Sequence, residues 1–325
     1  MTVKVNIISG FLGAGKTTMI KKLLAEESLG DGLAIIENEF GDISIDGDRL
    51  KEAGVEIKSI SSGCICCTLS GDFQKAIRNL IKEYKPKTII IEPTGVGMLS
   101  DIISAVNRIK ESEDIELNMA MTIVDVLDFE DYIEVFGKFF ADQIINANVI
   151  VLSKGQLTDE NKVNDVIRSV RELNPHANMI ATSWDQLKAC DILEIGELQQ
   201  SHSRHNHDNC NCHDHDHCHC HCHDHEHDHG QDHEDADTQF DYWSFETMKT
   251  YKKEDIESIL KSLRDSAYGK VLRAKGSFLV TNKNWIDFDF TPSSFNMEEG
   301  KVKAIGQVTV IGNELDKNSI KGLFE

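Results

Sequence analysis

A glycine-rich loop near the N-terminus has the residue types and spacing of a phosphate-binding site. The run GFLGAGKT, residues 10–17, fits the pattern G-x-x-x-x-G-K-[ST] between an apolar run and a helical pattern. In such a loop, backbone N–H groups converge on phosphate oxygens at the N-terminus of a helix. Lys16 would reach the β- and γ-phosphates, and the Thr17 hydroxyl would bind Mg²⁺. We expect phosphate contacts from consecutive residues: Gly13, Ala14, Gly15, Lys16, Thr17 and Thr18.

An acid should stand near that Mg²⁺ ion. The run IIIEPTGVG, residues 89–97, places Glu92 at the carboxyl end of an apolar strand, where the Walker B acid of P-loop proteins lies. Thr94 and Gly95 follow in the position of a loop that senses the γ-phosphate. The alternative is an acid that caps the next helix. The two motifs together predict a site for a purine nucleoside triphosphate.

The residues that would read the base are Ser153, Lys154 and Gln156, in the run SKGQ after another apolar strand. The usual guanine-reading loop has Asn-Lys-x-Asp. Lys154 can still stack on a purine and Gln156 still offers an acceptor, but the carboxylate is missing. A charged hydrogen bond contributes about 1.5–3 kcal/mol, so discrimination against adenine would fall roughly ten- to hundredfold. The sequence favours GTP and leaves ATP open.

Three cysteines in the run SSGCICCTLSGD form a second candidate site. Cys64, Cys66 and Cys67 could supply two or three thiolates, which leaves at least one position of a tetrahedral ion vacant and suits metal exchange. Glu37 is the first candidate for that position and Glu39 the second. The alternative is a redox pair or a buried thiol cluster. Because the motif lies between the two segments expected to respond to the γ-phosphate, we expect nucleotide to control its hold on the metal.

A third group of metal ligands lies far along the chain. All histidines except His176 fall between residues 202 and 233, where they alternate with cysteines and acids. Such a segment cannot offset its ordering entropy without bound ions, so residues 196–239 are expected to form a disordered, metal-binding linker. It would either collect ions for the cysteine motif or store them passively.

The elements that position these residues follow from the hydrophobic pattern. Apolar runs that alternate with amphipathic helical patterns predict a mostly parallel sheet covered by helices, an α/β P-loop fold over residues 1–195. The expected strands are 3–9, 33–38, 87–92, 119–126, 148–153 and 178–182, and the expected helices include 17–28, 72–84 and 100–111. Residues 240–325 predict a small α+β domain with three or four antiparallel strands.

Composition limits the partners and the compartment. The net charge is −21 over 325 residues, which argues against nucleic-acid and anionic-membrane binding. No apolar run is long enough for a transmembrane helix, and no signal peptide is recognisable, which predicts a cytoplasmic protein. The nine cysteines should therefore be thiols or metal ligands. We expect the isolated Cys190 to be a buried apolar residue.

The motifs GFLGAGKTT, IENEFGD, SGCICCTLSGD, IIIEPTG and TIVDVLDF, with a histidine-rich linker and a module containing GKVLRAKG, resemble the CobW-type metallochaperone GTPases over almost the whole chain. The resemblance implies a SIMIBI-class GTPase fold, slow GTP hydrolysis, and delivery of Zn²⁺ or Co²⁺ to a client metalloenzyme or cobalamin-pathway enzyme. It implies phosphate contacts from residues 13–18, Mg²⁺ at Thr17 with Glu92 nearby, and transferred metal at Cys64, Cys66 and Cys67. We expect Lys16, Thr17 and Glu92 to carry the hydrolysis.

Two other functions compete with nucleotide-controlled metal delivery. A metal buffer with a vestigial nucleotide site would not need the intact Lys16, Thr17 and Glu92. A small-molecule P-loop kinase would need an arginine-rich lid, which the sequence lacks. The sequence leaves the client, the oligomeric state (a homodimer included) and the physiological metal open.

Overall fold

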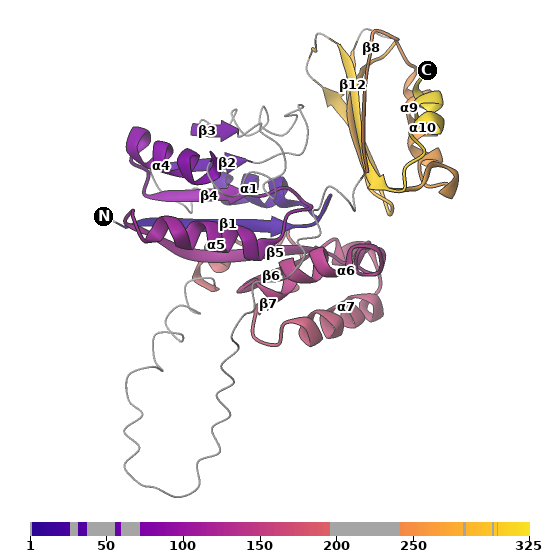
Figure 1. Cartoon of the computed structure of the whole chain (residues 1–325). Coiled ribbons are helices and arrows are strands. Elements are labelled where there is room, and N and C mark those ends of the chain that lie inside the picture. Colours follow the sequence, from indigo (N-terminus) through magenta and orange to yellow (C-terminus); the bar gives the residue numbers. More distant parts are fainter. Residues whose placement is uncertain are drawn as a thin grey trace, which may run out of the picture.

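The computed structural model describes residues 2–26, 32–37, 56–59, 72–195, 241–281, 284–300, 302–303 and 305–325 (Figure 1). Glu39, the three cysteines of the CICC motif and the histidine-rich segment lie outside these residues. The boundaries expected for the linker stay predictions for the same reason.

The first sheet has seven parallel strands in the order β3-β2-β4-β1-β5-β6-β7. They are β1 (Val3–Gly10), β2 (Leu33–Glu37), β3 (Glu56–Ser59), β4 (Thr88–Glu92), β5 (Ile115–Asp125), β6 (Val149–Ser153) and β7 (Asn178–Ile180). The six strands expected from the sequence are all present. The seventh, β3, was not expected, because four residues at a sheet edge with two charged side chains carry little strand signal.

Helices cover both faces of this sheet, as the continuous apolar strands require. In β4, Ile89 and Ile91 belong to one core with four of the helices, while Ile90 belongs to the opposite core with α1. The helix bounds are α1 (Lys16–Ala25), α4 (Asp72–Tyr84), α5 (Leu99–Lys110), α6 (Phe129–Ile145) and α7 (Glu160–Leu173). The mostly parallel, helix-covered sheet predicted from sequence is therefore confirmed.

A second, antiparallel sheet forms the C-terminal domain, with the strand order β11-β10-β9-β12-β8. Its elements are β8 (Asp241–Thr247), α9 (Lys253–Ser262), β9 (Lys270–Leu279), β10 (Trp285–Phe290), β11 (Phe295–Gly300), β12 (Gly306–Asn313) and α10 (Lys317–Phe324). The sequence predicted three or four strands for this domain, but the sheet has five. The strand that was not expected is β11. Its run FNMEEG ends in two acids and a glycine, and such residues are depleted in strands.

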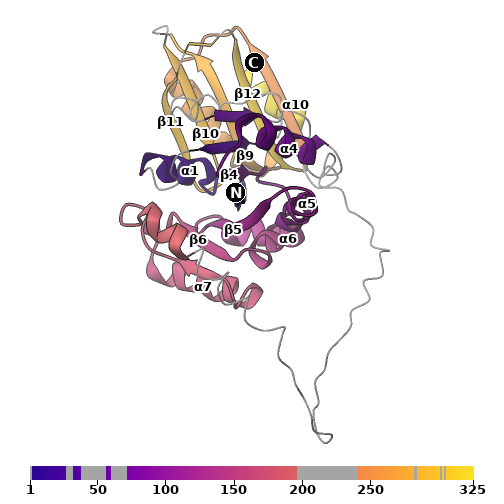
Figure 2. The same ribbon diagram turned by 90° about the vertical axis from the view of Figure 1, so that its left-hand side faces the viewer.

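The two faces of the second sheet are covered differently. Helices α9 and α10 pack on one face of the second sheet, on the side away from α1 (Figure 1). The opposite face meets the first domain, because Leu272 and Ile311 belong to the same core as α6 and α7. Seen from the side, strands β9–β12 stand over the domain that carries β1 and α1 (Figure 2). None of the described helices is long and apolar enough to cross a membrane.

Candidate functional site

The glycine loop connects β1 to α1, as its sequence predicted. Gly15 precedes the first residue of α1 with φ of 107°, in the left-handed region that favours glycine. A Cβ at this position would lie 2.9 Å from Cη2 of Trp184. The Trp184 indole therefore packs against the glycine loop at Gly15. Its Nε1 donates a hydrogen bond to the carbonyl oxygen of Leu152 over 3.0 Å. Trp184 was not expected at this site, because no local pattern in the sequence marks it.

Lys16 folds back over the loop that it follows. The side chain is buried, and its Nζ donates to the carbonyl oxygens of Gly10 at 2.9 Å and Phe11 at 3.3 Å. The ammonium group thus lies inside the arch of the loop. The oxygens of a bound phosphate would be charged acceptors for the Lys16 ammonium group. They would form stronger hydrogen bonds with it than the neutral carbonyl oxygens do.

Two acids lie side by side next to α1. Thr17 Oγ1 donates to Oε1 of Glu92 over 3.0 Å. Glu37 is buried and stands opposite Glu92 in the register of β2 and β4. Hydroxyl and carboxylate oxygens are the ligands that Mg²⁺ prefers, so Thr17 and Glu92 fit this ion. Glu37 was predicted as a ligand for the cargo metal, and the structure places it beside the nucleotide site.

The loop after β4 is held from α6. Gln143 is fully buried, and its Nε2 donates to the carbonyl oxygens of Gly95 at 3.2 Å and Gly97 at 2.8 Å. This is the segment predicted to sense the γ-phosphate, with Thr94 buried at its start. A Cβ on Gly95 would lie 2.7 Å from the Leu12 side chain, so the segment also touches the glycine loop. Gln143 gave no signal in the sequence.

The residues predicted to read the base lie after β6. Lys154 has φ of 60° and its Nζ contacts Oδ2 of Asp125, at the end of β5. Ser153 is buried, whereas Gln156 is exposed in a short 3₁₀ helix (Gly155–Leu157). Asp125 anchors the lysine, a role that was not expected from the sequence. The aspartate at the end of the apolar run TIVDV was the available signal.

The expectation for Cys190 is wrong. Its thiol is exposed, and its Sγ donates to Oδ1 of the neighbouring Asp191 at 3.5 Å. Residues 189–195 are helical, and Ala189 and Ile192 are the ones that face the core. Cys190 therefore lies on the solvent side of this segment.

The predicted site for the cargo metal is largely outside the described residues. Among those that are described, no group of three or more His, Cys, Asp or Glu side chains is arranged to hold a metal ion. The roles given to Cys64, Cys66 and Cys67 stay predictions.

A glycine loop between β1 and α1, with Lys16, Thr17 and Glu92 converging on it at the carboxyl ends of parallel strands, defines a P-loop nucleotide-binding protein. The family model for the CobW/HypB/UreG nucleotide-binding domain matches residues 4–181, so the chain belongs to that GTPase family.

Individual relatives agree with this family. The chain is 35% identical to the "Zinc chaperone YeiR" of Escherichia coli (strain K12) over 155 residues, 48% of this chain and 47% of the relative. It is 33% identical to the "Zinc chaperone CobW" of Sinorhizobium sp over 228 residues, 60% of this chain and 63% of the relative. These alignments thus span between about half and two thirds of the relatives' lengths. The crystal structure of Zn(II)-bound YjiA GTPase from E. coli matches with 20% identity and a TM-score of 0.47, covering 100% of this chain and 98% of that one.

Proposed function

We propose that this protein is a GTP-hydrolysing metallochaperone, which binds Zn²⁺ or Co²⁺ at Cys64, Cys66 and Cys67 and releases it to a client metalloenzyme under nucleotide control. The observation that carries the nucleotide half is the Thr17–Glu92 hydrogen bond, 3.0 Å, beside the buried Lys16. The names of the relatives, zinc chaperones and a zinc-regulated GTPase metalloprotein activator, support the metal half.

Each residue of the site would have a role in nucleotide binding, in hydrolysis or in coupling to the metal. The amide groups from Gly13 to Thr18 would bind the phosphates, and Lys16 would neutralise charge on the β- and γ-phosphates as water attacks the γ-phosphorus. Mg²⁺, when bound, neutralises the phosphates further. Thr17 and Glu92 would orient that ion, and Lys154 would lie against the base. Glu37 would couple the two halves, because it adjoins Glu92 and belongs to the segment that leads toward the cysteines.

The test is a Zn²⁺ or Co²⁺ titration of the full chain with a non-hydrolysable GTP analogue, with GDP and without nucleotide. Nucleotide control predicts tighter metal binding with the triphosphate. Lys16→Ala should remove the difference, although the lysine is expected to touch no metal. Equal metal affinity in all three states would contradict the proposal.

Turnover measurements distinguish the remaining functions. GTP and ATP hydrolysis should be compared with and without Zn²⁺ or Co²⁺. A metallochaperone GTPase should hydrolyse GTP slowly and respond to the metal. A metal buffer with a vestigial nucleotide site should bind several ions at residues 202–233 and show no hydrolysis that depends on Lys16.

A further inference from the structure

One turn of the second sheet reaches the phosphate loop. Strands β10 and β11 are joined by residues 291–294, Thr-Pro-Ser-Ser, here called the TPSS turn. The Thr291 N–H donates to the carbonyl oxygen of Ser294 at 2.7 Å, and the Ser294 N–H donates to that of Thr291 at 3.2 Å. Pro292 fixes its own φ in the middle of the turn. The turn therefore presents its side chains in set positions.

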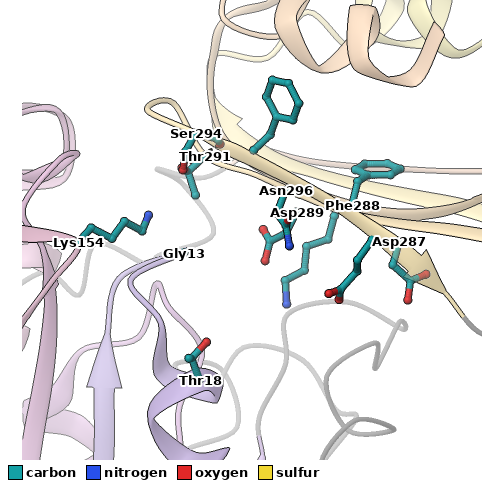
Figure 3. A pocket seen from close by; sticks show the side chains of 12 residues that line it. Gly13, Thr18, Lys154, Asp287, Phe288, Asp289, Thr291, Ser294 and Asn296 are labelled. Atoms are coloured by element: carbon teal, nitrogen blue, oxygen red, sulfur yellow. Dashed lines mark hydrogen bonds between the residues drawn. The ribbon is translucent and has the colours of Figure 1, made fainter. Parts of the chain in front are cut away.

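Thr291 packs directly on the tip of the phosphate loop. Gly13 has φ of 72°, and a Cβ on it would lie 2.3 Å from Cγ2 of Thr291. The threonine is buried, so this methyl group contacts the glycine without intervening water. The figure places Gly13 and the turn at the edge of the same cavity (Figure 3). The contact restricts the backbone of the residue whose N–H is expected to meet phosphate.

Ser293 makes a second contact, through α6. Its Oγ donates to Oδ2 of Asp128 over 2.9 Å, across a sequence separation of 165 residues. Asp128 is the buried N-cap residue of α6. One turn further on, the Tyr132 hydroxyl donates to the carbonyl oxygen of Leu12 in the phosphate loop at 3.1 Å. The TPSS turn thus supports the loop directly at Gly13 and indirectly through α6.

The cavity beside these contacts belongs to both domains. It has a volume of about 270 Å³, close to the lower end of ligand-sized pockets, about 300 Å³. The first domain contributes residues predicted to touch nucleotide: Gly13, Thr18 and Lys154. The second domain contributes charged and polar side chains: Lys275 of β9, and on β10 and β11 the acids Asp287, Asp289 and Glu298 with Asn296. Asp287, Asp289 and Asn296 are labelled on that wall in Figure 3.

We propose that the C-terminal domain completes the nucleotide-binding site, and that Thr291 is a positioning residue that holds Gly13 in its phosphate-binding conformation. This rests on the proposed nucleotide binding at the glycine loop. Since the contact stabilises the binding-competent loop, bound nucleotide must stabilise the docking of the two domains by the same factor.

The experiment measures GDP and GTP dissociation constants of the full chain by calorimetry, for the wild type and matched variants. Thr291→Ser removes the methyl group and keeps the hydroxyl, and Thr291→Val does the reverse. Thr291→Ser should weaken nucleotide binding about three- to tenfold, the effect of one buried methyl group. Thr291→Val should stay within about twofold of wild type, because the backbone hydrogen bonds still hold the turn.

Ser293→Ala provides an independent test, because this residue is exposed and its loss should not unfold the domain. It should weaken binding about three- to tenfold, the effect of losing one ordinary hydrogen bond at a solvent-exposed residue. Ser262→Ala on α9 is the control, since its hydroxyl bonds only within that helix, and it should leave affinity unchanged. In GTP turnover, Thr291→Ser should raise KM and leave kcat near the wild-type value.

Two results would overturn the proposal. One is wild-type nucleotide affinity in both Thr291→Ser and Ser293→Ala. The other is equal weakening by Thr291→Ser and Thr291→Val, which would assign the effect to the turn and not to the methyl contact. Lys16→Ala keeps the two proposals apart. If Lys16→Ala abolishes nucleotide binding and the turn variants leave it unchanged, the role proposed for the C-terminal domain is wrong and the proposed function stands. If the wild type binds no nucleotide, the proposed function itself fails.

Discussion

The Thr17 hydroxyl donates a 3.0 Å hydrogen bond to Glu92, a residue 75 positions further along the chain. The bond joins the first turn of α1 to the carboxyl end of β4. Both oxygens are of the kind that binds Mg²⁺ beside a triphosphate, so the pair gives a direct way to test the nucleotide site.

Glu92→Gln should lower GTP turnover about ten- to hundredfold, because the amide replaces one charged partner worth about 1.5–3 kcal/mol. The Mg²⁺ concentration for half-maximal turnover should rise as well. Thr17→Ser is the matched control, since serine keeps the hydroxyl and should retain most activity. Unchanged Mg²⁺ dependence in Glu92→Gln would exclude this acid from the metal site.

Gln156→Asp should increase the preference for GTP over ATP about ten- to hundredfold, because it restores the carboxylate that guanine recognition normally uses. Gln156 is exposed, so the change should not affect folding. Competition binding of GTP and ATP measures the ratio, with Gln156→Asn as the uncharged control. If the ratio does not move, residue 156 does not face the base.

Gln143→Met should lower the free energy of unfolding by about 1–3 kcal/mol, because two buried carbonyl oxygens, at Gly95 and Gly97, lose their donor. It should also bring the GTP and GDP affinities closer together, since the predicted γ-phosphate sensor is no longer held. Urea unfolding and calorimetry measure the two effects. Asn146→Ala is the control, because its side chain bonds only within α6.

Asp128 should make stability depend on pH. Burial, with the charge of Asp125 nearby, raises the pKa of Asp128 from 3.8 to about 6. Between these values the folded state binds more protons than the unfolded state, so this residue's contribution to stability is fully present below about pH 4 and is lost as pH rises through about 6.

Asp128→Asn should abolish that contribution and stabilise the protein at pH 7.5 relative to wild type. The amide oxygen can still accept from Ser293. Urea unfolding at pH 4.5, 6 and 7.5 measures the change. Asp165→Asn, an exposed residue of α7 paired with Arg168, removes the same charge and should leave the pH profile unaltered. Parallel wild-type and Asp128→Asn profiles would contradict the assignment.

Deleting residues 202–233 tests the histidine-rich segment. If the segment collects ions for the cysteine motif, Zn²⁺ should load Cys64, Cys66 and Cys67 more slowly, with unchanged final affinity. Stopped-flow loading measures the rate, and equilibrium titration measures the affinity. A passive store instead predicts lower capacity and an unaltered loading rate.

Local patterns were sufficient to predict the glycine loop between β1 and α1 and the sheet around it. The glycine spacing around Gly13 and Gly15 is a property of eight consecutive residues, and apolar strands such as β4 are recognisable because both of their faces are buried. Even there, the short edge strand β3 and the acidic strand β11 were missed. Their residue types are unfavourable for strands, and pairing with neighbouring strands overrides that preference.

The sequence by itself determined the P-loop class, the residues expected to hold phosphate and Mg²⁺, and the separate C-terminal domain, because each depends on periodicity or spacing within one short segment. Only the tertiary structure decided what surrounds that site. Gln143, Trp184 and Thr291 reach the nucleotide loops from α6, from the segment after β7 and from the second sheet. No local pattern marks such residues, because a single side chain that contacts a loop far away in the sequence adds no periodicity to its own segment.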